Sequence, residues 1–388
     1  MREFYVPPAI IFGSGASEQT GEQSRRLGVK KGLIVTDKFI SGSGILDGII
    51  KTLEENGLHY TVYNGVATEP TIDYVSEGLQ VYRENGCDFL LAVGGGSPID
   101  TAKGISVMVA NPGPIEEYMG AGKVPEKGAP LVAVPTTAGT GSEASQFTVI
   151  THTRTHTKML IGSPFIVPDA AIVDPLLTLG CPPGLTAAVA IDALTHAIEA
   201  YVSLKSQPMS DIFCLSAIRL ISGNLRNAWV KGNDKEAREN TMLGSLQAGM
   251  AFSNSSVALV HGMSRPIGAY FNVPHGASNA ALLGTVTGFS LTGNPARYAR
   301  IAEAMGEDIS ELTDIEAAEK GADAVNRLIK DIKVSSLEEL GVDKENFEEL
   351  APQMAADAIA SGSPANNPRP VSPEEIIELY KTAYRQSA

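Results

Sequence analysis

The chain has 388 residues, of which 43% are hydrophobic and 19% are charged, so it is long enough for two domains with a sizeable apolar core. Its formal net charge of -14, without any basic tract, argues against nucleic acid or an anionic membrane as a partner. The three scattered cysteines form no CxxC pair and the N-terminal apolar run is short and broken by prolines, so we expect a cytoplasmic protein without a signal peptide or a membrane span.

The first half of the sequence alternates apolar strand patterns with helical patterns. Strands are predicted at Ala9–Phe12, Gly32–Thr36, His59–Tyr63, Phe89–Val93, Leu131–Val134 and Ala170–Val173, and helices at Ser17–Leu27, Ile45–Asn56, Thr71–Asn85 and from the glycine run GGGS to Val109. Apolar strands separated by helices predict a doubly wound, mostly parallel sheet that is covered on both faces. The alternating stretch Gln146–Ile161 instead predicts a hairpin with its turn near Arg154. Because this stretch is not helical, the spacing of His152 and His156 does not place them together as ligands, and a solvated hairpin is the better interpretation.

After Leu179 the helical pattern takes over and strand signals nearly vanish. Helices are predicted at Val189–Val202, Met209–Asn227, Asp234–Phe252, Pro295–Met305, Ile315–Ile332, Glu345–Ala360 and Pro373–Gln386. The proline-rich CPPG at 181–184 is the expected connector. We therefore predict an α/β domain over residues 1–179 and an all-helical domain over residues 180–388.

Two glycine-rich loops follow predicted strands of the first half. Gly94, Gly95, Gly96 and Ser97 lead from a strand into a helix, where backbone N–H groups and the helix N-terminus favour a phosphate. The second loop, PTTAGTGSE at 135–143, also follows a strand and adds hydroxyl donors. A tight turn is the alternative interpretation of the first loop, but two such loops at the carboxyl ends of strands predict a nucleotide or dinucleotide site.

Asp37 ends another predicted strand of the first half. Its carboxylate is placed to accept hydrogen bonds from a ribose, and its charge would favour NAD(H) over the 2′-phosphorylated NADP(H). An aspartate that caps the next turn or helix is the alternative interpretation.

The candidate metal ligands lie between residues 192 and 275. Asp192 and His196 are four apart in a predicted helix and therefore share one face, and His261 and His275 follow, each beside a glycine. Three imidazoles and one carboxylate suit a borderline divalent ion such as Fe²⁺ or Zn²⁺. Each residue alone has a structural alternative, as a helix cap, a buried core histidine or a turn residue, so it is the set that predicts a metal site.

With these residues assembled, the chain resembles the iron-containing (group III) alcohol dehydrogenase family over essentially its full length. The motifs that carry the resemblance are GGGSPIDTAK, PTTAGTGSE, IDALTHAIEAY, HGMSRPIGA, VPHGASNA and NPRPVSPEEI. The resemblance implies a dehydroquinate-synthase-like architecture, with an active site in the cleft between an α/β and a helical domain. It also implies NAD(H) or NADP(H), a divalent metal that is usually iron, and a homodimer or higher homo-oligomer, with the segment near Phe4–Ile11 as a candidate for intersubunit pairing.

The resemblance also implies a role for individual residues. The metal ligands would be Asp192, His196, His261 and His275. The dinucleotide would be lined by Asp37, Gly94, Gly95, Gly96, Ser97, Asp100, Thr136, Thr137, Thr140 and Lys158, and flanked by Phe147, Leu177 and Cys181.

Two positions depart from the family pattern. Many members carry a second histidine one helical turn after the first in the HGMS motif, where this chain has Arg265 followed by Pro266. This departure leaves the four ligands intact but puts a histidine proton relay in doubt. We hypothesise that the Arg265 guanidinium holds the carboxylate or sulfonate tail of an aldehyde substrate, and a salt bridge to a neighbouring carboxylate is the alternative. At the second position, Glu69 stands where asparagine is common.

The expected reaction is metal-assisted hydride transfer between a nicotinamide and a small alcohol or aldehyde. A glycerol-dehydrogenase-like polyol oxidoreductase is one alternative, and a metal-dependent lyase of the dehydroquinate-synthase-like superfamily is another, although lyases lack the HGMS…PHG context. A nucleotide-dependent binding or scaffold protein is a third. The sequence leaves open the physiological alcohol, the metal bound in the cell and the direction of the reaction.

Overall fold

The computed structural model describes residues 2–155 and 157–386. The chain divides into two compact units, Tyr5–Gly180 and Cys181–Ala388, and the residues up to Phe4 belong with the second unit. The N-terminal residues join the helical unit through hydrogen bonds: Arg2 Nη1 donates to the carbonyl of Ser206 (2.6 Å), and Gln207 Nε2 donates to the carbonyl of Glu3 (3.0 Å).

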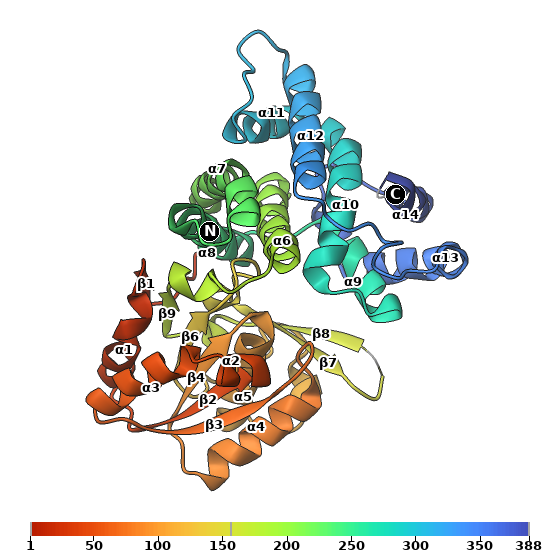
Figure 1. Ribbon diagram of the computed structural model, residues 1–388. Helices are drawn as coiled ribbons and strands as arrows, with labels where there is room; N and C mark the ends of the chain where they lie inside the picture. The colour runs from red at the N-terminus through yellow and green to blue at the C-terminus, as the bar shows by residue number, and fades with distance from the viewer. Residues whose placement is uncertain (1, 156, 387–388) are drawn as a thin grey trace. The chain divides into compact units, whose positions relative to one another are not determined.

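The unit Tyr5–Gly180 is built on a six-stranded sheet (Figure 1). In sheet order its strands are β1 (Ala9–Phe12), β9 (Ala170–Val173), β6 (Leu131–Pro135), β4 (Phe89–Gly94), β2 (Lys31–Asp37) and β3 (His59–Val66). Every neighbouring pair is parallel. The chain runs from β2 outward to β3 and then returns to β4, so the winding reverses between β2 and β4.

Helices cover both faces of this sheet. They are α1 (Thr20–Arg26), α2 (Lys38–Gly42), α3 (Ile45–Glu55), α4 (Ile72–Glu84) and α5 (Gly96–Ala110). Ile34 and Leu91 pack in one apolar cluster with residues of α3, whereas their neighbours Leu33 and Leu90 pack in another with residues of α4 and α5. Alternate residues of a strand face opposite sides, so both faces must be apolar, which explains the continuous apolar runs in the sequence. The predicted doubly wound sheet is confirmed.

A smaller sheet contains β5 (Gly120–Ala121), β7 (Phe147–His152) and β8 (Thr157–Gly162). β7 and β8 are antiparallel, as the alternating sequence pattern predicts. The Nε2 atom of His152 lies 3.2 Å from Glu116 Oε1, so this histidine contacts a carboxylate next to the hairpin. His156, the other member of the histidine pair, lies outside the described residues.

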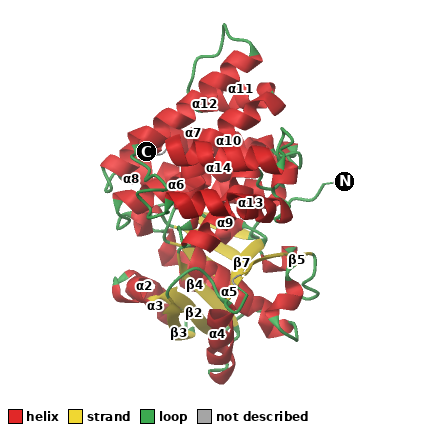
Figure 2. Cartoon of the chain, turned by 90° about the vertical axis from the view of Figure 1, so that its right-hand side faces the viewer, coloured by secondary structure: helices red, strands yellow, loops and turns green. Residues whose placement is uncertain are grey.

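The second unit is helical, as the red segments of Figure 2 show. Its helices are α6 (Pro183–Val202), α7 (Pro208–Val230), α8 (Lys235–Asn254), α9 (Leu259–Phe271), α10 (His275–Ser290), α11 (Pro295–Ala304), α12 (Asp314–Asp331), α13 (Lys344–Ala360) and α14 (Pro373–Gln386). α6 is long and apolar enough to cross a membrane, contrary to the expectation of no such run, but 83% of its apolar window is buried inside the protein. A helix that is apolar all round and covered by other helices is a core helix.

The sequence patterns missed α9 and α10, the helices that contain His261 and His275, as well as the short α2. Glycines occur in both long helices and Pro266 lies inside α9, and both residue types weaken a helical signal. Both helices nevertheless bury apolar residues in the core of the unit, such as Ile267 and Leu283. Tertiary packing therefore stabilises them where intrinsic propensity does not.

Candidate metal and dinucleotide sites

The four candidate metal ligands come from three helices of the helical unit. Asp192 and His196 lie one turn apart on α6, His261 lies in the first turn of α9, and His275 is the first residue of α10. One donor atom from each residue lies within 4.8 Å of the donor atoms of the other three. Three imidazoles and a carboxylate at this separation fit one Fe²⁺ or Zn²⁺ ion.

The surroundings of His261 favour a neutral imidazole. Asp192, His196 and His261 are buried, and His275 is partly exposed. Burial lowers the pKa of His261 well below its ordinary value, with help from His196 and Arg265. A metal binds the unprotonated nitrogen of histidine, so this shift keeps the ring ready for a metal. The His196 ring stacks on the His261 ring at a centroid distance of 4.5 Å, which helps to fix both ring planes.

Glu199 orients His261 and was not assigned a role from the sequence. Its Oε2 atom lies 2.6 Å from His261 Nδ1, and its carboxylate also accepts hydrogen bonds from the backbone N–H groups of Ala258 and Val260 at the start of α9. Burial raises the pKa of Glu199 to about 7, although these backbone donors act in the opposite direction. With the carboxylate as acceptor, Nδ1 carries the proton and Nε2 presents its lone pair to a metal.

Asn279 is a second residue that sequence reasoning missed. It lies one helical turn after His275 on α10, and its Nδ2 atom donates to Asp192 Oδ1 at 2.6 Å. Helical spacing was a usable signal for Glu199, which follows His196 by three residues on a predicted helix. It was no signal for Asn279, because α10 was not predicted.

Gly276 brings α10 close to α6. A Cβ atom at this position would stand 2.8 Å from the carbonyl oxygen of Ala188, closer than real Cβ contacts allow. Its neighbour His275 thereby reaches Asp192, with Nε2 3.9 Å from Oδ1. Close approach of two helices, and not a turn, explains this glycine.

Arg265 lies one turn after His261 on α9. Its Nη1 atom donates to Ser363 Oγ at 3.0 Å. Burial lowers the pKa of Arg265, while the nearby Glu199 acts in the opposite direction. No carboxylate in the described part of the chain forms an ion pair with this guanidinium, so the structure does not contain the salt bridge considered from the sequence.

The predicted dinucleotide loops of the α/β unit leave the carboxyl ends of neighbouring strands. Asp37 ends β2, Gly94 ends β4, and Pro135, which pairs with Gly94, ends β6. Gly94 has a φ of 151°, a conformation that glycine adopts readily. A Cβ atom on Gly96 would stand 2.7 Å from Thr140 Cγ2, so the two loops pack directly against each other. Open α/β sheets bind ligands at this edge, where the winding reverses.

The predicted cofactor residues take up several different positions in the structure. Gly94, Gly95, Gly96, Thr136, Thr137 and Thr140 lie where the two loops meet, and Ser97 lies in the first turn of α5. Phe147 begins β7, and Leu177 packs against the apolar cluster on one face of the sheet. Cys181 lies in the helical unit, where its carbonyl accepts a hydrogen bond from Arg238.

Three charged members of the predicted cofactor set already have partners within the chain. Asp37 Oδ1 caps α2 by accepting from the backbone N–H of Ile40 at 2.7 Å. Asp100 accepts from the Ser142 hydroxyl and, at 2.8 Å, from the backbone N–H of Val149, and thus ties α5 to the second loop and to β7. Lys158 Nζ pairs with Glu69 Oε2 at 2.6 Å, so the unusual Glu69 contacts one of the predicted cofactor residues.

Two ionisable side chains, Lys103 and Glu143, are buried next to the glycine loops. Lys103 Nζ donates to the carbonyl oxygens of Ser145 and Phe147, each at 2.8 Å, and burial lowers its pKa to about 8. Burial raises the pKa of Glu143 to about 7, and Lys103 acts in the opposite direction. Lys103 ends the motif GGGSPIDTAK, and its hydrogen bonds tie α5 to the segment that follows the second loop. Glu143 ends the motif PTTAGTGSE.

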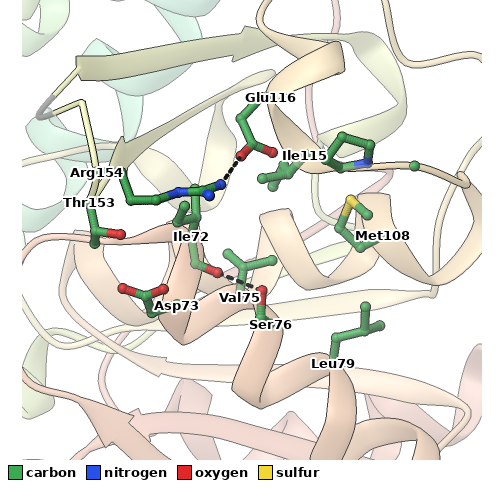
Figure 3. A pocket seen from close by; sticks show the side chains of 12 residues that line it. Ile72, Asp73, Val75, Ser76, Leu79, Met108, Ile115, Glu116, Thr153 and Arg154 are labelled. Atoms are coloured by element: carbon green, nitrogen blue, oxygen red, sulfur yellow. Dashed lines mark hydrogen bonds and ion pairs between the residues drawn. The ribbon is translucent and has the colours of Figure 1, made fainter.

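A pocket of about 360 Å³ lies elsewhere in the α/β unit (Figure 3). Residues of α4 such as Val75 and Ser76 line it, together with Arg154 of the hairpin and Glu116. Arg154 is exposed and lies 3.9 Å from Glu116. None of the residues assigned to the metal or to the dinucleotide lines this pocket, so it supplies no argument for either site.

Both halves of the chain match a described protein family. Residues 7–175 match "Iron-containing alcohol dehydrogenase", and residues 186–384 match "Fe-containing alcohol dehydrogenase family, C-terminal". The chain belongs to the iron-containing alcohol dehydrogenase family. The resemblance seen in the sequence motifs is thereby confirmed, and membership makes the protein a metal-dependent oxidoreductase that acts on the CH–OH group of alcohols or on the matching aldehydes.

Individual relatives agree with this family along the whole chain. The 1,3-propanediol dehydrogenase of Klebsiella pneumoniae is 41% identical over 387 residues, which is 99% of each chain. A crystal structure of 1,3-propanediol oxidoreductase has a TM-score of 0.96 at 41% identity and covers 99% of this chain and 100% of that one. The structure of sulfoacetaldehyde reductase from Bifidobacterium kashiwanohense in complex with NAD+ has a TM-score of 0.88 at 28% identity and covers 99% of both chains. The predicted fold class, an α/β domain plus a helical domain, is confirmed.

Proposed function

We propose that this alcohol dehydrogenase binds one divalent ion, Fe²⁺ or Zn²⁺, through Asp192, His196, His261 and His275. Hydride then passes between NAD(H) and a small alcohol or aldehyde. The observation that supports the proposal is the convergence of these four donor atoms, from three helices, within 4.8 Å. When bound, the ion supplies Lewis acidity toward the substrate oxygen, and the nicotinamide supplies the redox chemistry.

The residues of the chain have separate tasks in this proposal. Glu199 keeps the proton of His261 on Nδ1, so that Nε2 is the atom that binds. The backbone N–H groups of the loops after β4 and β6 bind the pyrophosphate of the dinucleotide, with the N-terminus of α5 adding its dipole. Asp37 accepts from a ribose hydroxyl and disfavours a 2′-phosphate by charge repulsion.

Metal removal tests the proposal directly. Protein purified anaerobically is assayed for NADH oxidation with an aldehyde before chelation, after chelation, and after Fe²⁺ or Zn²⁺ is restored. We expect activity to disappear on chelation and to return with the metal, while NADH still binds to the stripped protein, as measured by its fluorescence. Undiminished activity after complete metal removal would refute a metal-dependent mechanism.

The preference for NAD(H) has its own test at Asp37. Asp37→Ser retains an N-cap hydroxyl for α2 but removes the negative charge, so kcat/KM with NADPH should rise relative to kcat/KM with NADH. Asp47→Ser changes net charge equally at an exposed position in the first turn of α3 and serves as the control. A cofactor ratio that shifts to the same extent in both variants would contradict a local role for Asp37.

We propose a carboxylate or sulfonate tail on the aldehyde as the finer substrate preference. Two observations support it. The Arg265 guanidinium, one turn from His261, bonds to the Ser363 hydroxyl and to no carboxylate in the described part of the chain, and one relative is a sulfoacetaldehyde reductase. Neutral and anionic aldehydes of equal length are compared with the wild type and Arg265→Ala. The anionic substrate should lose far more kcat/KM, and equal losses for both substrates would rule out an anion-binding role.

We also propose a cytoplasmic homodimer or higher homo-oligomer. β1 is an edge strand of the six-stranded sheet, which leaves one side of it available for pairing with a second copy. The buried thiols of Cys87 and Cys214 are compatible with a reducing compartment. Light scattering after size-exclusion chromatography measures the mass directly, and a monomer at micromolar concentration would contradict the assembly.

A further inference from the structure

Asn279 is a fully buried amide at the centre of the candidate metal ligands. Its Nδ2 atom lies 2.6 Å from Asp192 Oδ1, 3.2 Å from His261 Nε2 and 3.2 Å from His275 Nε2. Three atoms, all belonging to candidate ligands, therefore converge on one NH₂ group that has only two protons.

The orientation of this amide follows from its neighbours. Glu199 faces His261 Nδ1, so that nitrogen carries the proton and Nε2 is an acceptor. The Asn279 atom beside Nε2 must therefore be the nitrogen and not the oxygen. The opposite atom, Asn279 Oδ1, is buried and has no hydrogen-bond partner among the described residues.

A metal ion and the amide N–H groups compete for the single lone pair of each histidine Nε2. Binding of a cation through these two nitrogens therefore requires the Asn279 nitrogen to release them. Rotation about the terminal side-chain bond of asparagine meets only a broad two-fold barrier, and it exchanges nitrogen for oxygen. The oxygen is an acceptor without a partner in the described part of the chain, and oxygen atoms are suitable ligands for divalent cations.

We propose that Asn279 is a fifth, switchable member of the metal site. Its nitrogen holds three ligands in register before a metal binds, and its oxygen turns to face the bound cation. The inference rests on the proposed metal site of Asp192 and the three histidines. It adds a residue that helical spacing from His275 places on the same face of α10.

The test measures metal binding and coordination, and not activity alone. Co²⁺ is loaded into the wild type and Asn279→Ala, its affinity is measured by competition with a chelator, and its visible absorption is recorded. We expect affinity to fall by about 10- to 100-fold in the variant. The absorption should intensify, because loss of the fifth donor leaves a four-coordinate ion.

Two further variants make the outcome decisive. Asn279→Asp keeps the shape of the side chain and adds an anionic oxygen, so it should bind Co²⁺ more tightly than the wild type even if Asn279→Ala folds poorly. Asn240→Ala removes a partly buried amide from α8, whose side chain bonds to Asn224, and should leave both readouts unchanged.

Each contrary result overturns a stated part of the inference. Unchanged Co²⁺ affinity and an unchanged spectrum in Asn279→Ala would overturn the proposal. Reduced affinity with an unchanged spectrum would show that the Asn279 oxygen does not bind the ion. Weaker binding in Asn279→Asp would also contradict it. Failure of the metal site itself is distinguished by Asp192→Ala: if that variant binds Co²⁺ as the wild type does, the proposed function fails and not the role of Asn279.

Discussion

Glu199 links the start of α9 to the protonation of His261, and a change of its charge alone tests this link. Glu199→Gln keeps the shape of the side chain but places an amide N–H₂ group against backbone donors or against His261 Nδ1. We expect metal affinity to fall by about 10- to 100-fold, the usual effect of losing a residue that orients a metal-binding histidine. Competition with a chromogenic chelator measures the dissociation constant.

An exposed glutamate provides the control for this prediction. Glu236→Gln makes the same chemical change in the first turn of α8 and should leave metal affinity unchanged. A thermal melt of each metal-free variant separates loss of metal affinity from loss of folding. Equal affinities of Glu199→Gln and the wild type would show that His261 does not depend on this carboxylate.

Glu143 should make the free energy of unfolding of the α/β unit depend measurably on pH. Burial raises its pKa from 4.5 to about 7, so the folded chain holds the proton more tightly than the unfolded chain does. The resulting stabilisation is fully present below pH 4.5 and is lost as the pH rises toward 7. A shift of this size corresponds to at most roughly 3 kcal/mol. Glu143→Gln removes this titration, so the free energy of unfolding of the variant should rise relative to that of the wild type between these pH values.

Urea denaturation at closely spaced pH values checks this difference. Burial also raises the pKa of Asp100. Asp100 is present in both proteins, so its contribution to the pH dependence of stability largely cancels in the comparison. A stability difference that stays constant from pH 4.5 to 7 would mean that Glu143 is ionised throughout in the folded chain.

Individual site residues were predictable from the sequence where a helical spacing or the scarcity of histidine pointed to them. Asp192 and His196 share a helix face that the sequence reveals, and scarce histidines pointed to His261 and His275. The structure places one donor atom of each within 4.8 Å of the others. Glu199 follows His196 by three residues on the same predicted helix, so spacing was a usable signal for it as well. Asn279 carried no such signal, because α10 was not predicted.

At the scale of elements, the strands that are buried in the sheet were the easiest to predict from the sequence. Strands such as β4 (Phe89–Gly94) and β6 (Leu131–Pro135) are buried along their whole length, so a short apolar run between polar turns identifies each of them. α9 and α10 lack a usable pattern, because glycines and Pro266 interrupt it. Packing within the core determines these helices, and a single sequence does not reveal packing.

Gly276 tests how closely α10 must approach α6. Gly276→Ala would place a Cβ atom 2.8 Å from the Ala188 carbonyl oxygen, so α10 must shift and carry His275 with it. We expect a stability loss of about 1–3 kcal/mol, as for other overpacked sites, together with weaker metal binding. Chemical denaturation and chelator competition measure the two effects.

The same helix supplies a matched control. Gly288 lies in α10 and is exposed. A Cβ atom added at this position would have no other atom within 4 Å. Gly288→Ala should be neutral or should stabilise the helix by about 0.4–1 kcal/mol, and it should leave metal affinity unchanged. If both variants lost metal affinity to the same degree, close approach at Gly276 would not be the cause.

At the scale of the whole molecule, the alternating first half and helical second half of the sequence predicted the fold class. The attachment of the N-terminal residues to the helical unit was not predictable, because it rests on single hydrogen bonds such as that of Gln207 to the Glu3 carbonyl. Contacts made by one side chain with distant backbone have no periodicity, and so they leave no pattern in the sequence.

The two proposed ligands should protect different units from hydrogen exchange. A metal links α6, α9 and α10, so its binding should slow exchange in these three helices. At a free concentration roughly 1,000 times the dissociation constant the stabilisation approaches about 4 kcal/mol for amides that exchange through opening of the site. NADH should instead slow exchange in the loops that follow β4 and β6. His261→Ala should lose the metal effect and retain the NADH effect, because its substitution lies in the helical unit alone. Equal protection of both units by the metal without NADH would contradict the assignment of each ligand to one unit.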